Sequence, residues 1–182
     1  MKLTDLAIIF QVFFLCLLLT LHIRSNKLHC ETVNEIMYNN VMDGIVEDAL
    51  NAGYKSIDKK GNPVVDLNEV KRCFEAEKEL YNSTDRHILL YVETDGFFLW
   101  DNELSNIWEE KVIFSAGGDT LHEKKVYELM EYINARYSIS LYLPFSEGEA
   151  YINTVEEYSL LILSFNRNYE IKCFSGAKIH KK

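Results

Sequence analysis

The amino-acid sequence predicts an α+β protein: an N-terminal transmembrane helix that continues into an amphipathic helix, then a small domain with a mainly antiparallel sheet and two or more helices. Three observations lead to this prediction. An uncharged apolar run lies near the N-terminus, helical apolar spacing follows it, and the rest of the chain contains separate helix-like and strand-like segments. We therefore divide the chain into a transmembrane anchor (1–27), an amphipathic stalk helix (28–54) and a C-terminal domain (55–182).

Composition limits the classes of partner. At 182 residues and 48% hydrophobic content, the chain is long and apolar enough for one folded domain. The net charge is −9, although Lys2, Arg24 and Lys27 outnumber Asp5 within the first 30 residues, so the excess acid lies in the remaining chain. An acidic domain repels phosphate backbones, and we expect no nucleic-acid partner.

The predicted anchor is the run LAIIFQVFFLCLLLTLHI, from Leu6 to Ile23, which contains no formal charge. It is just long enough to cross a hydrocarbon core of about 30 Å as a helix, with membrane lipid as its partner. The residues from Arg24 to Lys27 lack the small-x-small pattern of a signal-peptide cleavage site. A cleaved signal peptide and a buried core helix are the alternatives to a retained, single-pass span.

Gln11 is the polar residue inside this span that lies farthest from the interfaces, so it is a candidate for intramembrane packing against another helix. The flanking positive charges are nearly balanced, and they do not decide the orientation. We expect the C-terminal domain to be extracytoplasmic, because long domains translocate largely regardless of their charge.

Residues 28–52 keep the spacing of an amphipathic helix, and Gly53 supplies a stop signal. No proline separates this helix from the anchor, so the two form either one helix or two helices with a break at Asn26. The apolar stripe predicts a protein partner or self-association through the stalk. Its members are Val33, Ile36, Met37, Val41, Ile45 and Ala49.

A hydrophobic N-terminal helix that runs into an amphipathic one, ahead of a compact strand-rich domain, resembles the architecture of pilin-like proteins, including the TadE-like minor pilins of bacterial Tad systems. Asp5 precedes the apolar run, where type IV pilins carry a glutamate that pairs with a neighbouring subunit. The segment YNNVMDGIVEDAL and a later Asp-Gly pair also resemble uncharacterised single-pass proteins of Firmicutes. The first resemblance implies a minor component of a pilus-like or secretion assembly; the second implies no activity.

The stretch ILLYVETDGFFLWDN, residues 88–102, predicts a β-hairpin. Its flanks are rich in β-branched and aromatic residues, and Asp95-Gly96 is a strong signal for a two-residue type I′ turn, in which both residues have positive φ. In that register Glu93 lies opposite Phe98.

Three acids in this stretch, Glu93, Asp95 and Asp101, raise the question of a catalytic carboxylate pair. The predicted hairpin uses Asp95 in the turn and places Asp101 near the far end, so we expect the three carboxylates not to converge. The turn is the preferred interpretation, and an acidic site is the alternative.

The other elements are predicted from local signals. Asp66 with Glu69, and Thr120 with Glu123, indicate the starts of two helices. Residues 56–66 are expected to form an exposed loop. Strands are expected at 138–144, at 158–165 in the sheet interior, and at 169–174 on an edge.

The standard catalytic and phosphate-binding motifs are absent from the sequence, and we predict no catalytic, cofactor-binding or metal-binding residues. Cys16 lies in the span, which leaves an odd number of cysteines outside it: Cys30, Cys73 and Cys173. One disulfide with a free thiol, an intermolecular bridge and three reduced thiols all remain open. The sequence favours a non-enzymatic, membrane-anchored structural or interaction protein. The alternative is a membrane-tethered hydrolase or ligand-binding domain whose site is assembled only by the fold.

Overall fold

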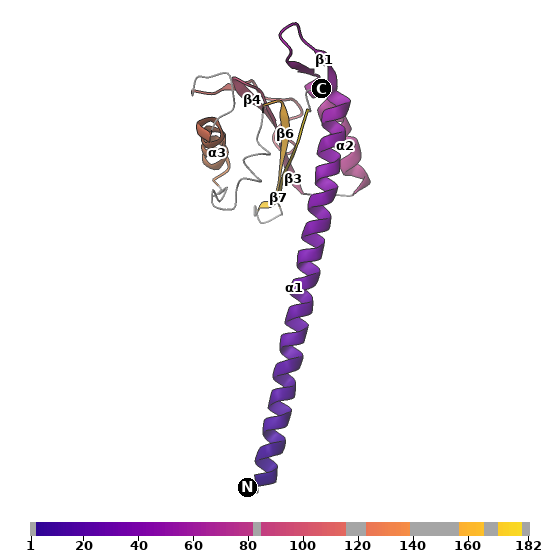
Figure 1. Ribbon diagram of the computed structural model, residues 1–182, viewed down its shortest axis with the longest axis vertical. Coiled ribbons are helices and arrows are strands. Elements are labelled where there is room, and N and C mark those ends of the chain that lie inside the picture. The colour runs from indigo at the N-terminus through magenta and orange to yellow at the C-terminus, as the bar shows by residue number, and fades with distance from the viewer. Residues whose placement is uncertain (1–2, 82–84, 116–122, 139–156, 166–170, 180–182) are drawn as a thin grey trace. The chain divides into compact units, whose positions relative to one another are not determined.

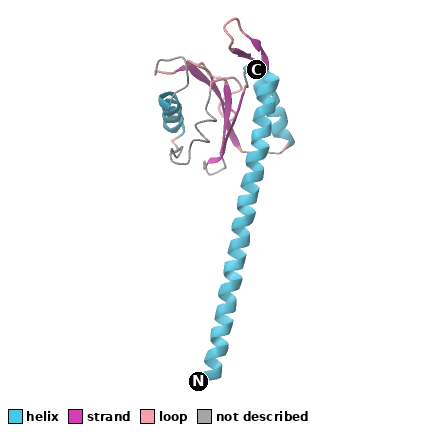
Figure 2. Cartoon of the chain, viewed as in Figure 1, coloured by secondary structure: helices cyan, strands magenta, loops and turns pink. Residues whose placement is uncertain are grey.

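The computed structural model describes residues 3–81, 85–115, 123–138, 157–165 and 171–179, without the side chains of residues 3–9, 123 and 172. The chain divides into two compact units, Met1–Tyr38 and Asn39–Lys182, which we call the N-terminal and C-terminal units. The predicted α+β class is confirmed, because the described part contains three helices and a mainly antiparallel sheet (Figures 1 and 2). The compact C-terminal unit begins at Asn39, earlier than the domain boundary predicted at residue 55.

Helix α1 runs from Leu3 to Gly53. It continues through Asn26, whose side-chain nitrogen lies 3.2 Å from His22 Nε2, so the alternative of a break at this residue is not observed. The helix ends at the predicted glycine. A side chain on Gly53 would overlap Val70 of the next helix, which explains why only glycine fits at this end.

The N-terminal unit exposes large apolar side chains along much of α1, from Phe10, 70% exposed, to Met37, 61% exposed. Among the helices of the described residues, none combines the length and apolar character that a membrane crossing requires.

The described residues of the C-terminal unit form a five-stranded sheet with the order β5-β4-β3-β6-β7. All the neighbouring strands in it pair antiparallel. The strands are β3 (Arg86–Val92), β4 (Gly96–Asp101), β5 (Val112–Ile113), β6 (Ser159–Phe165) and β7 (Ile171–Lys178). Among the described strands, β6 takes the interior position predicted for 158–165 and is buried along its whole length, and β7 lies at the edge, as predicted for 169–174, of which residues 171–174 are described.

Helix α3 (Glu123–Tyr137) covers one face of this sheet. The apolar side of this helix packs against alternate residues of the strands, as the period of two in a strand requires. The resulting core includes Ile88, Leu90, Leu99, Val126, Leu129, Ile133, Leu161 and Leu163.

The end of α1 and helix α2 (Leu67–Leu80) contribute a second set of buried residues. From α2, the Phe74 ring meets His87 and Trp100 edge-on, at centroid distances of 5.6 and 6.1 Å. Asp43 of α1 accepts a hydrogen bond from Ser175 of β7. The buried α1 residues are Met42, Ile45, Val46, Ala49 and Leu50. The last turns of α1 are therefore part of the folded C-terminal unit.

The start of α2 agrees with the predicted cap. The Asp66 carboxylate accepts hydrogen bonds from the backbone N–H groups of Asn68 and Glu69, at 3.1 and 3.3 Å. The cap predicted at Thr120 lies outside the described residues, and so does the strand predicted at 138–144 apart from Ser138, which is in a turn with a φ of +53°.

The exposed loop predicted for residues 56–66 is only partly correct. Strands β1 (Tyr54–Ile57) and β2 (Pro63–Val65) pair as a separate two-stranded hairpin, and Gly61 takes a φ of +84° in its turn. The strands were missed because they are short and mostly exposed, so no buried alternating face signals them.

Candidate functional site

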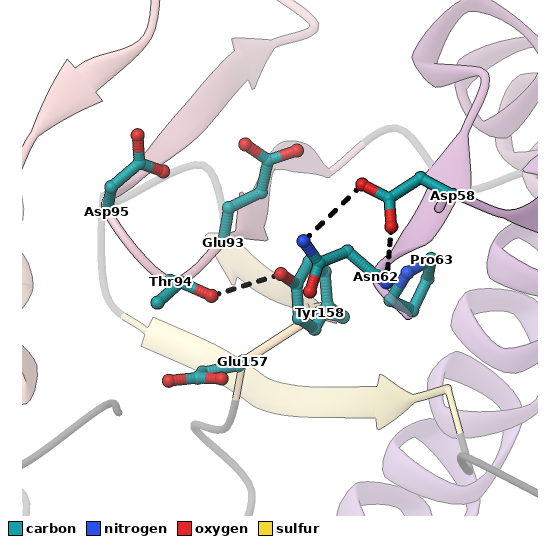
Figure 3. Close-up of a pocket in the computed structure, with 8 residues that line it drawn as sticks. All are labelled: Asp58, Asn62, Pro63, Glu93, Thr94, Asp95, Glu157 and Tyr158. Atoms are coloured by element: carbon teal, nitrogen blue, oxygen red, sulfur yellow. Dashed lines mark hydrogen bonds between the residues drawn. The ribbon is translucent and has the colours of Figure 1, made fainter. Parts of the chain in front are cut away.

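A cavity of about 540 Å³ opens between the β1–β2 hairpin and the β3–β4 turn in the C-terminal unit. Figure 3 shows that its lining comes from three segments far apart in the sequence. The lining residues are Asp58, Asn62, Pro63, Glu93, Thr94, Asp95, Glu157 and Tyr158. Four of these eight side chains are carboxylates, so the cavity is the strongest candidate for a functional site in the described part of the chain.

On the side of the β1–β2 hairpin, the Asp58 carboxylate accepts hydrogen bonds from backbone groups of the turn in which it lies. One carboxylate oxygen accepts hydrogen bonds from the backbone N–H groups of Lys60 and Asn62, at 2.7 and 2.8 Å. The backbone hydrogen bond from Asn62 is the largest cause that lowers the pKa of Asp58 below its usual value. Asp58 thus stabilises the turn that ends with Gly61, and it is ionised at neutral pH.

On the opposite side, Lys111 lies between two of the acids. Its Nζ is 2.5 Å from Glu93 Oε2 and also bonds Asp95 Oδ1, and it stands 5.7 Å from the centre of the Phe98 ring. The hydrogen bond from Lys111 lowers the pKa of Asp95. A carboxylate with a lowered pKa is a poor proton donor at neutral pH, so this arrangement is an ion-paired clamp rather than an acid–base pair.

Tyr158 lines the cavity in a strained conformation, with a φ of +61°. Its backbone N–H donates to the Val92 carbonyl at 2.7 Å, and its hydroxyl lies 3.0 Å from Thr94 Oγ1 (Figure 3). A bulky residue at positive φ persists only where its surroundings hold it, and such strain is often found at functional sites. Beside it, Glu157 Oε1 is buried without a hydrogen-bond partner among the described residues.

The predicted hairpin exists, but its turn is displaced. The observed register pairs Val92 with Phe97 and Tyr91 with Phe98, whereas the prediction placed Glu93 opposite Phe98. Glu93 N–H donates to the Gly96 carbonyl at 2.8 Å, so Thr94 and Asp95 are the central turn residues.

The type I′ assignment for Asp95-Gly96 is therefore wrong. Neither Asp95 nor Gly96 has a positive φ. Gly96 instead lies in β4, paired with Ile113 of β5, and a Cβ at this position would overlap the Val112 carbonyl oxygen. Glycine is required by the close approach of a neighbouring strand rather than by the turn.

The three acids of the β3–β4 hairpin form two separate ion-paired groups. Asp101 lies at the far end, opposite Ile88, where the Arg86 guanidinium binds it with two hydrogen bonds, the shorter 2.5 Å long. The expectation that Asp101 stays apart from the others is correct, but Glu93 and Asp95 do converge, on Lys111. Lys111 was missed because the chain turns back at β5 to bring it to the acids, and no local pattern signals that contact.

Other side chains that could take part in catalysis or metal binding are buried or lie apart from one another. His87 and Ser164 are fully buried on neighbouring strands, with His87 Nδ1 2.9 Å from Ser164 Oγ. All four cysteines are free thiols in the structure. Over the described residues, no group of three or more histidine, cysteine or acidic side chains is arranged to hold a metal ion.

Comparisons with protein-family models, curated proteins and solved structures gave no match. The resemblance to pilin-like proteins therefore remains a prediction from the sequence.

The clamp gives a prediction about pH. Because the pKa of Asp95 is lowered in the folded state, its stabilising contribution is present above the unfolded-state pKa and is lost as pH falls through the folded-state value, below about pH 4. Replacing Lys111 with glutamine should raise the Asp95 pKa towards its ordinary value, which an NMR titration of the carboxyl carbons measures. Lys60→Gln, on the facing hairpin, should leave it unchanged. An unmodified chain in which Asp95 titrates at or above its ordinary value would contradict the clamp.

Proposed function

We propose that this protein is a membrane-anchored, non-enzymatic interaction protein. Its N-terminal helix spans the membrane once and its C-terminal unit lies outside the cytoplasm. The part of the predicted stalk up to Met37, whose apolar side chains are exposed, contacts other proteins, as in the minor components of pilus-like or secretion assemblies. The span is proposed from the sequence of Leu6–Ile23, a stretch that includes residues whose side chains are outside the structural description.

One observation carries the proposal: α1 is a single helix from Leu3 to Gly53 with two different environments. Its last turns are buried in the C-terminal unit, where Val46 and Ala49 are fully inaccessible. Towards the N-terminus, apolar side chains are exposed on every side of the helix, which suits contact with lipid or with another protein rather than with water. A helix whose C-terminal end packs in a folded unit, and whose N-terminal part exposes apolar side chains, is suited to attach that unit to a membrane.

The acids of the two hairpins also support a structural role. Asp58 is used by its own turn, Glu93 and Asp95 share Lys111, and Asp101 binds Arg86. Each of these carboxylates has a partner that explains its position without a reaction.

Fractionation tests the proposal. The full chain, expressed in a bacterial host, should sediment with membranes and resist extraction by alkaline carbonate, because about 18 apolar residues in a helix span the hydrocarbon core. A version that begins at Leu28 should be released into the soluble or peripheral fraction. A full-length chain that carbonate releases as easily as the Leu28 version would overturn the anchor.

A membrane-tethered hydrolase or ligand-binding domain is the second candidate, and the cavity beneath the hairpins favours it. The strained Tyr158 and a Glu157 oxygen that has no hydrogen-bond partner among the described residues lie on one side of that cavity. Its net negative lining suits a cationic ligand. A saturable NMR shift at Tyr158 on titration with a diamine, lost in Glu157→Gln, would support this candidate; no shift would leave the interaction protein as the better account.

A further inference from the structure

One face of α1 carries a seven-residue repeat that is free of charge. Positions separated alternately by four and three residues hold Val12, Cys16, Leu19, Ile23, Asn26, Cys30, Val33 and Met37. All eight side chains are exposed. We call this set the seam. A spacing that averages 3.5 residues keeps one face of a helix directed at a parallel partner helix, and the seam sustains it over more than three heptads.

The charged residues of the same segment avoid the seam. Arg24, Lys27, Glu31 and Glu35 all lie at other heptad positions. Lys27 pairs instead with Glu31 on its own helix, at 3.7 Å. In this segment charged residues begin at Arg24, and from there to Met37 the four seam positions hold none of them, so the pattern favours a surface that another helix covers.

We propose that the seam binds the seam of a second copy of this chain, forming a parallel, in-register homodimer. This inference rests on the proposed membrane anchor, because two copies anchored in one membrane necessarily point in the same direction. This shared direction excludes the antiparallel pair. In a parallel pair without a shift in register, each seam residue lies opposite its own counterpart.

Three features of the chain fit a second copy. In the in-register pair Asn26 meets Asn26, so the two side-chain amides can hydrogen-bond to each other, whereas a register shifted by one heptad would bury each amide against an apolar side chain. The flanking positions bring Lys27 opposite His22 and Asn34 opposite His29, so no two like formal charges meet across the interface. Small cysteines at two seam positions allow close approach within and just outside the predicted span. Gln11 lies off the seam and takes no part.

Cysteine cross-linking of the full chain in native membranes tests the pairing. In a Cys16→Ala chain, Cys30 should give a disulfide-linked dimer when membranes are treated with copper phenanthroline. Cys30→Ser should remove that dimer. Adding Val33→Cys to Cys30→Ser should restore it, because Val33 is the next seam position. Adding Glu31→Cys instead moves the thiol by about 100° around the helix and should give at least about fivefold less dimer.

Equal dimer yields from Glu31→Cys and Val33→Cys, or no dimer from Cys30 and Val33→Cys, would overturn the pairing. Cys73 and Cys173 are present in every variant, so any contribution from them is constant. Carbonate extraction of the same samples reports on the anchor separately, and cross-linking is scored in whichever fraction holds the chain. A chain that resists extraction but does not cross-link refutes the homodimer and leaves the anchor intact; a released chain refutes the anchor.

Discussion

Replacing Gly96 with alanine should destabilise the C-terminal unit by about 2–3 kcal/mol, because the new methyl group has no space. The Cβ would overlap the backbone carbonyl oxygen of Val112 and stand 3.1 Å from the Ile113 Cα. Both neighbours are backbone atoms of β5, so the strand itself would have to move. Denaturant unfolding of the full chain in detergent, followed by tryptophan fluorescence, measures the change.

Gly44 provides the matched control. A Cβ at this helical position meets nothing within 4 Å. Alanine has the higher helix propensity, so Gly44→Ala should leave the free energy of unfolding unchanged or raise it by up to about 1 kcal/mol. If Gly96→Ala were as well tolerated as Gly44→Ala, the pairing of β4 with β5 would be wrong.

The buried ion pair at the far end of the hairpin should give an even larger loss. Asp101→Ala leaves the Arg86 guanidinium without its main partner, in a site where the arginine side chain is only 13% exposed and the carboxylate is not exposed at all. Asp101 also accepts a hydrogen bond from the Glu103 backbone N–H at 3.0 Å. Breaking a buried pair from one side costs about 3–5 kcal/mol, which the same unfolding measurement would detect.

A second arginine–carboxylate pair with similar geometry serves as the comparison. Arg72 binds Glu69 through two hydrogen bonds on the surface of α2, where the Arg72 side chain is 71% exposed. Water screens such a pair, so Glu69→Gln should change stability very little. Similar losses from Asp101→Ala and Glu69→Gln would mean that the Asp101 site is open to water.

Local signals in the sequence were enough to predict much of this fold. Asp66 was identifiable as a helix cap because the groups it binds are two and three residues away. Likewise, the continuous apolar run of β6 correctly indicated a strand with both faces covered.

Local sequence signals did not predict the observed position of the β3–β4 turn. Asp95-Gly96 has the composition of a type I′ turn, but the pairing of Gly96 with Ile113 places the glycine in a strand instead. Similarly, Thr94 and Tyr158 are 64 residues apart, so their contact at the cavity follows from the pairing of β3 with β6 and from no sequence motif. The candidate site could not have been predicted for that reason.

The most direct test of the membrane-anchored account is the intact mass of the chain recovered from carbonate-washed membranes. The account predicts one species that retains Leu6–Ile23, with the mass of about 21.2 kDa expected for all 182 residues. Recovery of a shorter chain that begins after Ile23, or recovery of the full chain only in the soluble fraction, would contradict it.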